Sequence, residues 1–176
     1  INYSLVEYDY KFCQYRSIDL HKRETGNNCD CHESQLGKII SAFLHGSEHI
    51  FWMSKKQSEI YHERFPFLKD NNQTVLSSIF SQKDLEFIEK LHNKRTQEGW
   101  NPTTWAVIDG NSWIKGVEES VQVVKNKMPN NNVEVIGGLQ YYDLLSKLAE
   151  YHGLSFHPLG GDTCPRTVIE AKLLGM

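Results

Sequence analysis

Several features are missing from this sequence, and each absence excludes a class of protein. The 176 residues include only four cysteines, too few for a disulfide-held scaffold. No apolar run approaches the roughly 20 residues that a membrane-spanning helix needs. The polar start INYSLVEYDYKF does not have the pattern of a signal peptide. The net charge is only −3 and the basic residues are scattered, which indicates no surface for nucleic acid.

From these absences we expect a cytoplasmic protein with no transmembrane segment and no nucleic-acid partner, and we leave a peripheral membrane contact open. No G-x-G-x-x-G triplet of glycines follows any predicted strand, which disfavours a nicotinamide-dependent enzyme. The chain also lacks an initiator methionine, so we expect a fragment of a longer protein.

What is present is a regular alternation of strands and helices in the second half of the chain. With short connections, this alternation predicts parallel strands in a doubly wound, Rossmann-like α/β sheet flanked by helices. We expect a Rossmann-like unit over 49–176, in which 100–176 forms one half. The expected strands are 104–110, 133–138 and 154–161, and the expected helices are 115–128, 141–153 and 165–175.

The first half of the chain is less regular. Residues 1–48 are rich in Cys, His and Tyr, and we expect an irregular arm that ends in a helix at 35–44. The apolar run HIFWMS predicts a buried strand at 49–54, and Ser54 is a suitable N-cap for a helix that Pro66 ends. A second strand is expected at 74–80. Ser81 and Asp84 then form the pattern of a capping box at the start of another helix.

The predicted loops after the last three strands carry the candidate functional residues, because ligands of such sheets bind beyond the carboxyl ends of the strands. In the loop at 159–165, Gly160 and Gly161 allow close approach of the backbone to a ligand, and the helix start from Thr163 to Arg166 suits a phosphate. Asp162 and Glu170 add carboxylates that could bind sugar hydroxyls. The alternative is structural: Asp162 or Thr163 caps the helix and Glu170 pairs with Arg166 four residues earlier.

The loop at 109–115 adds a cation. Lys115 is expected at the start of a helix, where the helix dipole disfavours a positive charge unless a bound diphosphate compensates for it. Gly110 lies in the same loop. The alternative is an exposed lysine at a frayed helix end.

Three segments, TWAVIDGNSWIKG, VEVIGG and HPLGGDTCPRTVIEAKLLG, together resemble the donor-nucleotide half of GT-B glycosyltransferases of the glycogen-synthase-like retaining group. That family has a glycine loop with a Lys-Gly pair, followed by an E-x7-E motif and a helix of small residues. Here the motif is Asp162-x7-Glu170. Residues 49–99 similarly resemble the end of the acceptor-side half, so this piece of chain is not expected to be active alone.

The resemblance implies transfer of a sugar from a nucleotide-diphosphate sugar to a carbohydrate or glycolipid acceptor. Glu170 would hold the ribose, Lys115 the diphosphate, and Asp162 would lie near the sugar, so that Asp162 and Glu170 are the candidate catalytic residues. Where the family has Arg after the first glycine, this chain has Asn111, and Arg166 is a candidate replacement. The donor-binding candidates implied are Gly110, Asn111, Lys115, Gly160, Gly161, Thr163, Arg166 and Glu170. No cofactor is required by this family, and no D-x-D metal motif is present.

The arm holds its own candidate site. Cys13, His21, Cys29 and Cys31, with His32 beside them, could form a zinc site, but the spacing Cys29-x-Cys31 is not that of a zinc knuckle. Free thiols and a disulfide are the alternatives. A second function therefore stays open beside the enzyme, a non-catalytic α/β module that binds a nucleotide or a partner and carries a metal-binding cysteine arm.

Overall fold

The computed structural model describes residues 1–110 and 112–176 and divides them into two compact units, Ile1–Ile79 and Phe80–Met176. Each unit has its own parallel three-stranded sheet with helices packed on it. The predicted α/β class with parallel strands is confirmed. The strands are divided between two small sheets, and each unit is described by itself below.

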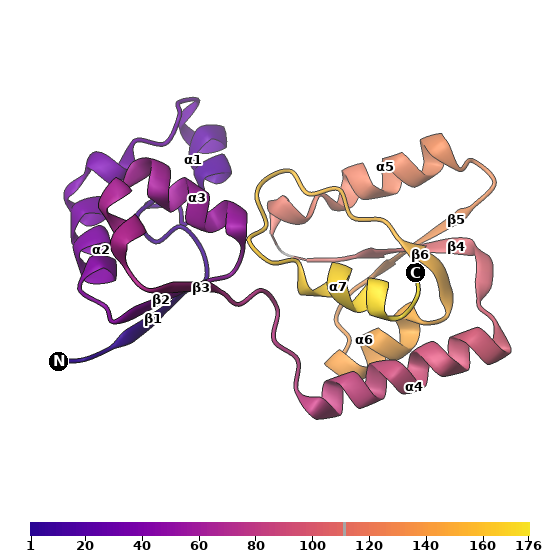
Figure 1. The fold of residues 1–176 in the computed structure, drawn as a ribbon. Helices are drawn as coiled ribbons and strands as arrows, with labels where there is room; N and C mark the ends of the chain where they lie inside the picture. The colour runs from indigo at the N-terminus through magenta and orange to yellow at the C-terminus, as the bar shows by residue number, and fades with distance from the viewer. Residues whose placement is uncertain (111) are drawn as a thin grey trace. The chain divides into compact units, whose positions relative to one another are not determined.

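The first unit is built on a sheet in which the strand order follows the order of the chain (Figure 1). All strand pairs in it are parallel. Its elements are β1 (Ser4–Glu7), α1 (Ile18–Thr25), the 3-10 helix η1 (Cys31–Glu33), α2 (Gln35–His45), β2 (His49–Trp52), α3 (Lys55–Arg64), the 3-10 helix η2 (Pro66–Asp70) and β3 (Gln73–Val75).

Burial alternates along the central strand β2 of this sheet. Ile50 and Trp52 are buried, whereas His49 and Phe51 are only half-buried. Because successive side chains of a strand point to opposite faces, one face of the sheet is covered and the other is open. The strand predicted at 49–54 is present, but it ends at Trp52 and only alternate residues of it are buried. The helices α1, α2 and α3 lie on the same side of this sheet in Figure 1.

The arm is more ordered than the sequence predicted, since it contains β1 and α1. The Ser17 side chain accepts a hydrogen bond from the backbone N–H of Leu20 and so caps α1. Gly26 ends the helix in the left-handed conformation, with φ 74°. The core of the unit is an aromatic cluster that includes Phe12, Trp52 and Tyr61, and the buried Cys13 and Cys29 belong to it.

The second unit has a sheet with the strand order β5-β4-β6 (Figure 1). Both strand pairs are parallel. Its elements are α4 (Gln82–Glu98), β4 (Asn101–Ile108), the 3-10 helix η3 (Trp113–Lys115), α5 (Val117–Lys127), β5 (Asn132–Ile136), α6 (Tyr141–Leu148), β6 (Tyr151–Leu154) and α7 (Arg166–Leu173).

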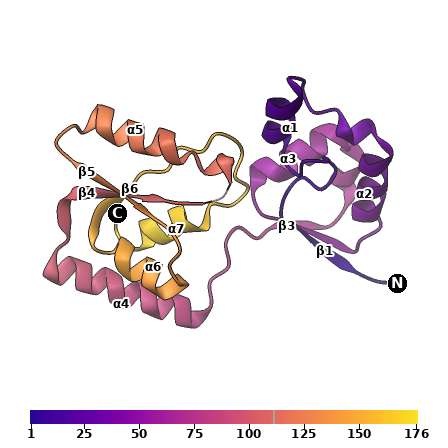
Figure 2. The same ribbon diagram turned by 180° about the vertical axis from the view of Figure 1, so that it is seen from behind.

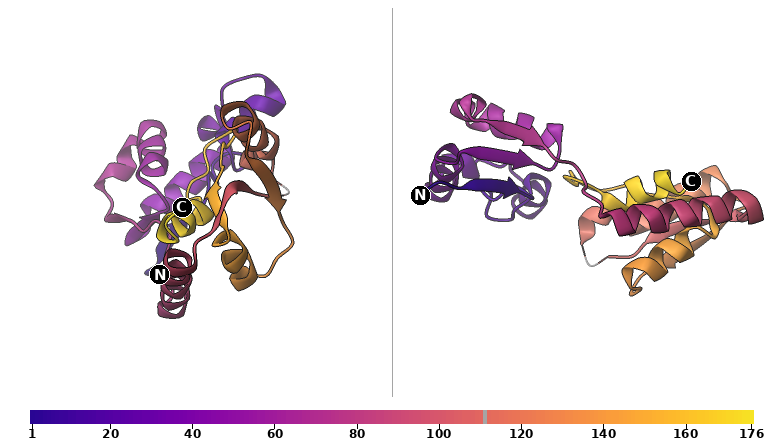
Figure 3. Two further views of the ribbon diagram at one scale, coloured as in Figure 1. Left: turned by 90° about the vertical axis from the view of Figure 1, so that its right-hand side faces the viewer. Right: turned by 60° about the horizontal axis from the view of Figure 1, so that its bottom comes forward.

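The helices of this unit cover both faces of the sheet. Figures 1 and 2 show α5 on one face and α4 and α6 on the other. Helix α7 packs against α4, as the right-hand view of Figure 3 shows. Consecutive residues of β4, Ala106 and Val107, are both buried, which is typical of a parallel strand covered on both faces.

Several predicted boundaries are correct and others are not. The capping box of α4 is present, with Ser81 and Asp84 each accepting a hydrogen bond from the other's backbone N–H. The strand predicted at 154–161 instead ends at Leu154, and 155–165 is irregular. The helix predicted at 141–153 ends at Leu148, and Gly153 lies inside β6, where a Cβ would come within 2.7 Å of the Trp105 ring. The strand predicted at 104–110 already begins at Asn101.

No helix within residues 1–110 or 112–176 is long and apolar enough to cross a membrane.

Candidate functional site

The strand order of the second unit creates a topological switch point between β4 and β6. The chain leaves β4 towards α5 on one face of the sheet and leaves β6 towards α7 on the other face. Ligands of open α/β sheets bind where two strand-end loops diverge in this way. The loops at 109–116 and 155–165 flank this point.

Three strand-end loops meet there. Asp109 donates its backbone N–H to the carbonyl oxygen of Ile136, at the end of β5. A Cβ on Gly137 would lie 2.8 Å from the Cβ of Asp109, so the loop after β5 approaches the loop after β4 closely. On the other side, Leu159 donates its backbone N–H to the carbonyl oxygen of Ile114 at 2.9 Å. The convergence that the sequence predicted is therefore present.

An ion pair joins two of these loops. Lys115 Nζ lies 2.7 Å from Asp162 Oδ2, and the two side chains are 38% and 16% exposed. Asp162 also accepts a hydrogen bond from the backbone N–H of Cys164 through its other oxygen, at 3.3 Å. The ammonium group of Lys115 further lies 5.8 Å from the centre of the Phe156 ring. A cation and a carboxylate from motifs 47 residues apart are thus in direct contact and within reach of solvent.

The surroundings of Lys115 differ from those predicted. Lys115 ends the 3-10 helix η3, and α5 begins two residues later, with Glu118 and Glu119 in its first turn. The two helices are separated by Gly116, which has φ 56°. Any other residue at this position would place its Cβ within 2.0 Å of the carbonyl oxygen of His157. Lys115 therefore does not oppose the dipole of α5, and that argument for a bound diphosphate no longer applies.

Glu170 lies in a different group of side chains, on the face of the sheet that holds α4, α6 and α7. It is 2% exposed, and its Oε1 accepts hydrogen bonds from Tyr141 Oη and from Arg166 Nε, both at 2.8 Å. Burial, followed by the bond to Glu170, raises the pKa of Tyr141 to about 12, so the phenol stays a hydrogen-bond donor at neutral pH. The ion pair with Arg166 that the spacing allowed is therefore formed.

Arg166 connects this group to α4. Its Nη2 lies 3.3 Å from Asp84 Oδ2 and 2.9 Å from Tyr141 Oη, and its guanidinium packs over the rings of Phe80 and Tyr141. Tyr142 donates its hydroxyl to the second oxygen of Asp84 at 3.0 Å. Sequence reasoning placed Asp84 only in the capping box and missed Tyr141 and Tyr142, because the residues of this group lie on three different helices and meet only in the folded unit.

The other predicted donor-binding residues that the structure describes lie in the loops after β4 and β6. Gly110 follows β4, and a Cβ on it would lie 3.3 Å from Lys115 Cγ. Gly160, Gly161 and Thr163 lie in the irregular segment 155–165. Thr163 does not cap α7, whose N-cap is Pro165. Asn111 lies outside the described residues.

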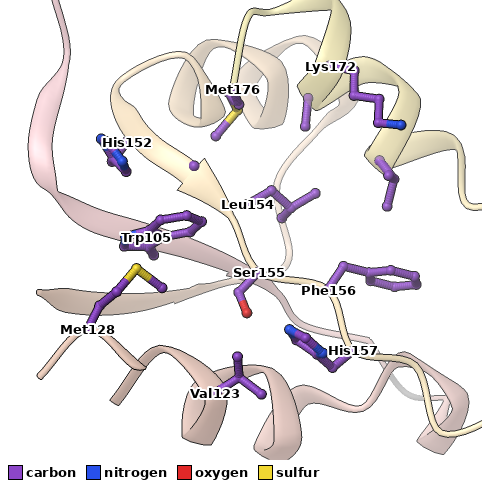
Figure 4. Close-up of a pocket in the computed structure, with 13 residues that line it drawn as sticks. Trp105, Val123, Met128, His152, Leu154, Ser155, Phe156, His157, Lys172 and Met176 are labelled. Atoms are coloured by element: carbon purple, nitrogen blue, oxygen red, sulfur yellow. The ribbon is translucent and has the colours of Figure 1, made fainter. Parts of the chain in front are cut away.

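A cavity of about 520 Å³ lies along β6, the edge strand of the sheet (Figure 4). Its walls are mainly apolar and include Trp105, Val123, Leu154 and Val168. His157 lines it as well, with its backbone N–H held by the Ser120 hydroxyl at 2.9 Å. None of the predicted donor-binding residues that the structure describes lines this cavity, but Phe156, which does line it, has its ring 5.8 Å from the ammonium group of Lys115.

The arm of the first unit brings Cys13, His21, Cys29 and Cys31 together. The ligand atoms of these four residues all lie within 4.8 Å of one another, and the group could hold a metal ion such as zinc. Burial raises the pKa of Cys13, and it raises the pKa of Cys29 to about 12. His32 is not part of the group, since its Nδ1 contacts Arg64 at 3.0 Å.

Comparisons with protein-family models, with curated proteins and with solved structures give no match for this chain.

Proposed function

We propose that the second unit binds the nucleotide-diphosphate part of a sugar donor and belongs to a GT-B glycosyltransferase that transfers the sugar to a carbohydrate or glycolipid acceptor. The observation that carries the proposal is the contact of Lys115 with Asp162 at the switch point of the sheet. The two residues come from the two separated motifs that resemble the family, and their positions agree with the roles that the resemblance implies.

The strand order supports the same proposal. In the Rossmann arrangement the order is 3-2-1-4-5-6, and the nucleotide binds where the order reverses next to the first strand. The order β5-β4-β6 corresponds to strands 2, 1 and 4 of that arrangement, with the third strand absent from the described part of the chain. The stretch from Met128 to Gly161 holds only β5, α6 and β6, whereas the family has an additional strand and helix there, so the chain departs from the family at this point.

In the proposed reaction the site stabilises the nucleoside diphosphate as the leaving group. The bond between the sugar carbon and the diphosphate oxygen breaks with both electrons going to the diphosphate, while the acceptor hydroxyl oxygen forms the new bond to that carbon and its proton passes to the departing diphosphate. Lys115 supplies a positive charge to the departing diphosphate, and the N-terminus of α7, whose N-cap residue Pro165 makes no side-chain capping bond, supplies backbone N–H groups. Asp162 keeps Lys115 in place before the donor binds.

The carboxylate of Glu170 is proposed to hold the ribose. Its two hydrogen bonds to Tyr141 and Arg166 both use Oε1, which fixes the orientation of the carboxylate and leaves Oε2 as the oxygen for a hydroxyl. Arg166 takes part in this positioning. Its contacts with Glu170, Tyr141 and Asp84 engage the guanidinium, so it is a poor replacement for the diphosphate-binding arginine of the family.

Thermal unfolding in the presence of uridine, guanosine and adenosine diphosphates tests the proposal. One nucleotide should raise the melting temperature of the intact protein by binding its folded state. Lys115→Ala should weaken that nucleotide by about 10- to 100-fold, because a hydrogen bond to a charged group is lost. Lys125→Ala, an exposed lysine of α5, is the matched control. Equal shifts in the two variants would remove Lys115 from the site.

The second candidate is a non-catalytic α/β module that binds a nucleotide or a partner and carries a metal in its arm. The Cys/His group of the first unit favours it, because a metal-binding arm is part of this candidate, whereas the glycosyltransferase family requires no metal. The candidates differ in turnover. If the protein binds a nucleoside diphosphate through Lys115, the matching sugar donor should then be tested with the longest available form of the protein. Binding without hydrolysis or transfer of the sugar would support the non-catalytic module.

A further inference from the structure

Four side chains from three segments of the arm meet in the interior of the first unit. Cys13 precedes α1, His21 lies within it, and Cys29 and Cys31 lie just before and at the start of η1. His21 is 5% exposed, Cys13 1% and Cys29 4%, and Cys31 is half-buried. The ligand atoms of all four residues lie within 4.8 Å of one another, which is close enough for one metal ion to contact all of them.

The two distances from His21 to thiol sulfur atoms agree with those of a tetrahedral zinc site. His21 Nδ1 lies 3.7 Å from Cys13 Sγ and 3.3 Å from Cys31 Sγ. With Zn–S bonds of about 2.3 Å and Zn–N bonds of about 2.1 Å at tetrahedral angles, sulfur and nitrogen ligands of one zinc lie about 3.5 Å apart. The observed distances fall on either side of that value.

A disulfide or a catalytic thiol would account for the group less well. Cys13, Cys29 and Cys31 are all free thiols, and a disulfide between any two of them would leave the third without a partner. A catalytic cysteine needs access to its substrate, whereas Cys13 is only 1% exposed and Cys29 only 4%. Thiolate-rich, four-ligand sites with tetrahedral geometry select zinc among the common divalent metals.

We propose that Cys13, His21, Cys29 and Cys31 bind one Zn²⁺ ion in a closed structural site that fixes the arm to the core of the first unit. All four positions of the metal are taken by protein atoms, so none is open to a substrate, and the site is structural. His21 binds through Nδ1, which requires that its Nε2 carry the proton.

Neighbouring residues hold the ligands in position. Ser17 caps the helix that carries His21, and its carbonyl oxygen lies 3.4 Å from Cys13 Sγ. Arg64, at the end of α3, donates from Nη1 to the carbonyl oxygen of Cys29 at 2.7 Å, and its guanidinium lies 5.3 Å from the centre of the Phe12 ring. These contacts join the metal loop to α3, as the outer shell of a zinc site does.

Metal analysis of the purified full chain tests the proposal. We expect one zinc per chain, a content that His21→Ala reduces severalfold. The matched control is His32→Ala, which removes the neighbouring histidine that contacts Arg64 and should keep one zinc. Cys164→Ser, a half-buried thiol of the second unit, should keep it as well. Equal metal loss in the His21 and His32 variants would overturn the assignment of the ligands.

Because His21→Ala can also unfold the arm, a measurement on the unchanged sequence is needed. Cobalt(II) added to zinc-free protein should give the visible absorption of a tetrahedral ion and the near-ultraviolet charge-transfer band of bound thiolates, and zinc should abolish both. Absence of zinc and of these bands, or mass spectrometry showing a disulfide among the three cysteines, would overturn the proposal. None of these results depends on nucleotide binding at Lys115, so failure here leaves the proposed function untouched.

Discussion

Glu170 is a nearly buried carboxylate whose charge is already balanced inside the protein. Arg166 and Tyr141 both bind its Oε1, and Arg166 in turn contacts Asp84. A buried carboxylate held in this way has a fixed orientation, because turning it would leave charged and polar partners unpaired. Such rigidity suits an acceptor of two ribose hydroxyl groups, and it also suits a purely structural network. A test must therefore separate loss of binding from loss of stability.

A double-mutant cycle with the ligand separates them. If Glu170 binds the ribose, the wild-type protein should bind the nucleoside diphosphate about tenfold more tightly than its 2′-deoxy form, since a hydrogen bond to a charged group is missing. Glu170→Gln should reduce that ratio towards one, whatever it does to stability. Isothermal calorimetry at one temperature measures both ratios. An undiminished preference for ribose in the glutamine variant would give Glu170 a structural role only.

At the scale of elements, the start of α4 is held by more than its own capping box. Asp84 accepts a hydrogen bond from the backbone N–H of Ser81, another from the hydroxyl of Tyr142 on α6, and an ion pair from Arg166 on α7. One carboxylate thus connects three helices on the same face of the sheet. These interactions, led by the hydrogen bond with Ser81, hold the pKa of Asp84 below its usual value of 3.8.

This lowered pKa predicts how stability depends on pH. A carboxylate whose folded-state pKa is depressed stabilises the fold above its unfolded-state pKa, and the contribution is lost as the pH falls from 3.8 towards the folded-state pKa. Asp84→Asn should therefore be less stable than the wild type in urea at about pH 7, and the difference should shrink at about pH 3. Glu89→Gln, exposed on the same helix, is the control. A difference that does not change with pH would contradict the assignment.

The same elements show what the sequence could predict. The N-caps Ser54 and Ser81 are predictable because the residues that satisfy a helix start lie within three positions of each other. The position of β6 was predicted wrongly because Gly153 is a glycine that makes room for the Trp105 ring on the neighbouring strand. This contact joins residues 48 positions apart and leaves no local pattern in the sequence. The sequence named the four candidate metal ligands, Cys13, His21, Cys29 and Cys31, but the unusual spacing Cys29-x-Cys31 left free thiols and a disulfide as alternatives. Only the folded arm shows that the four ligand atoms come within 4.8 Å of one another and that His32 instead contacts Arg64.

At the scale of the whole molecule, the two proposals concern separate hydrophobic cores. The proposed zinc ligands include Cys13 and Cys29 of the core in Ile1–Ile79, whereas Lys115 and Glu170 belong to Phe80–Met176, whose core is formed by residues such as Ile88, Leu145 and Leu148. A ligand that binds only the folded form of one unit stabilises that unit by mass action. Metal and nucleotide should therefore act on different parts of the chain.

Hydrogen exchange followed by mass spectrometry can observe both effects in the intact protein. Removal of zinc by a chelator should speed backbone exchange in peptides from residues 1–79, most strongly around α1 and η1, because the arm then loses the cross-link that the metal provides. Peptides from residues 80–176 should exchange as before. Addition of the nucleoside diphosphate should do the reverse, slowing exchange at 109–116 and 155–165 and leaving the arm unchanged. If chelation instead accelerates exchange equally in both units, the metal stabilises the chain as a single cooperative body, and the assignment of the zinc to the first unit alone is wrong.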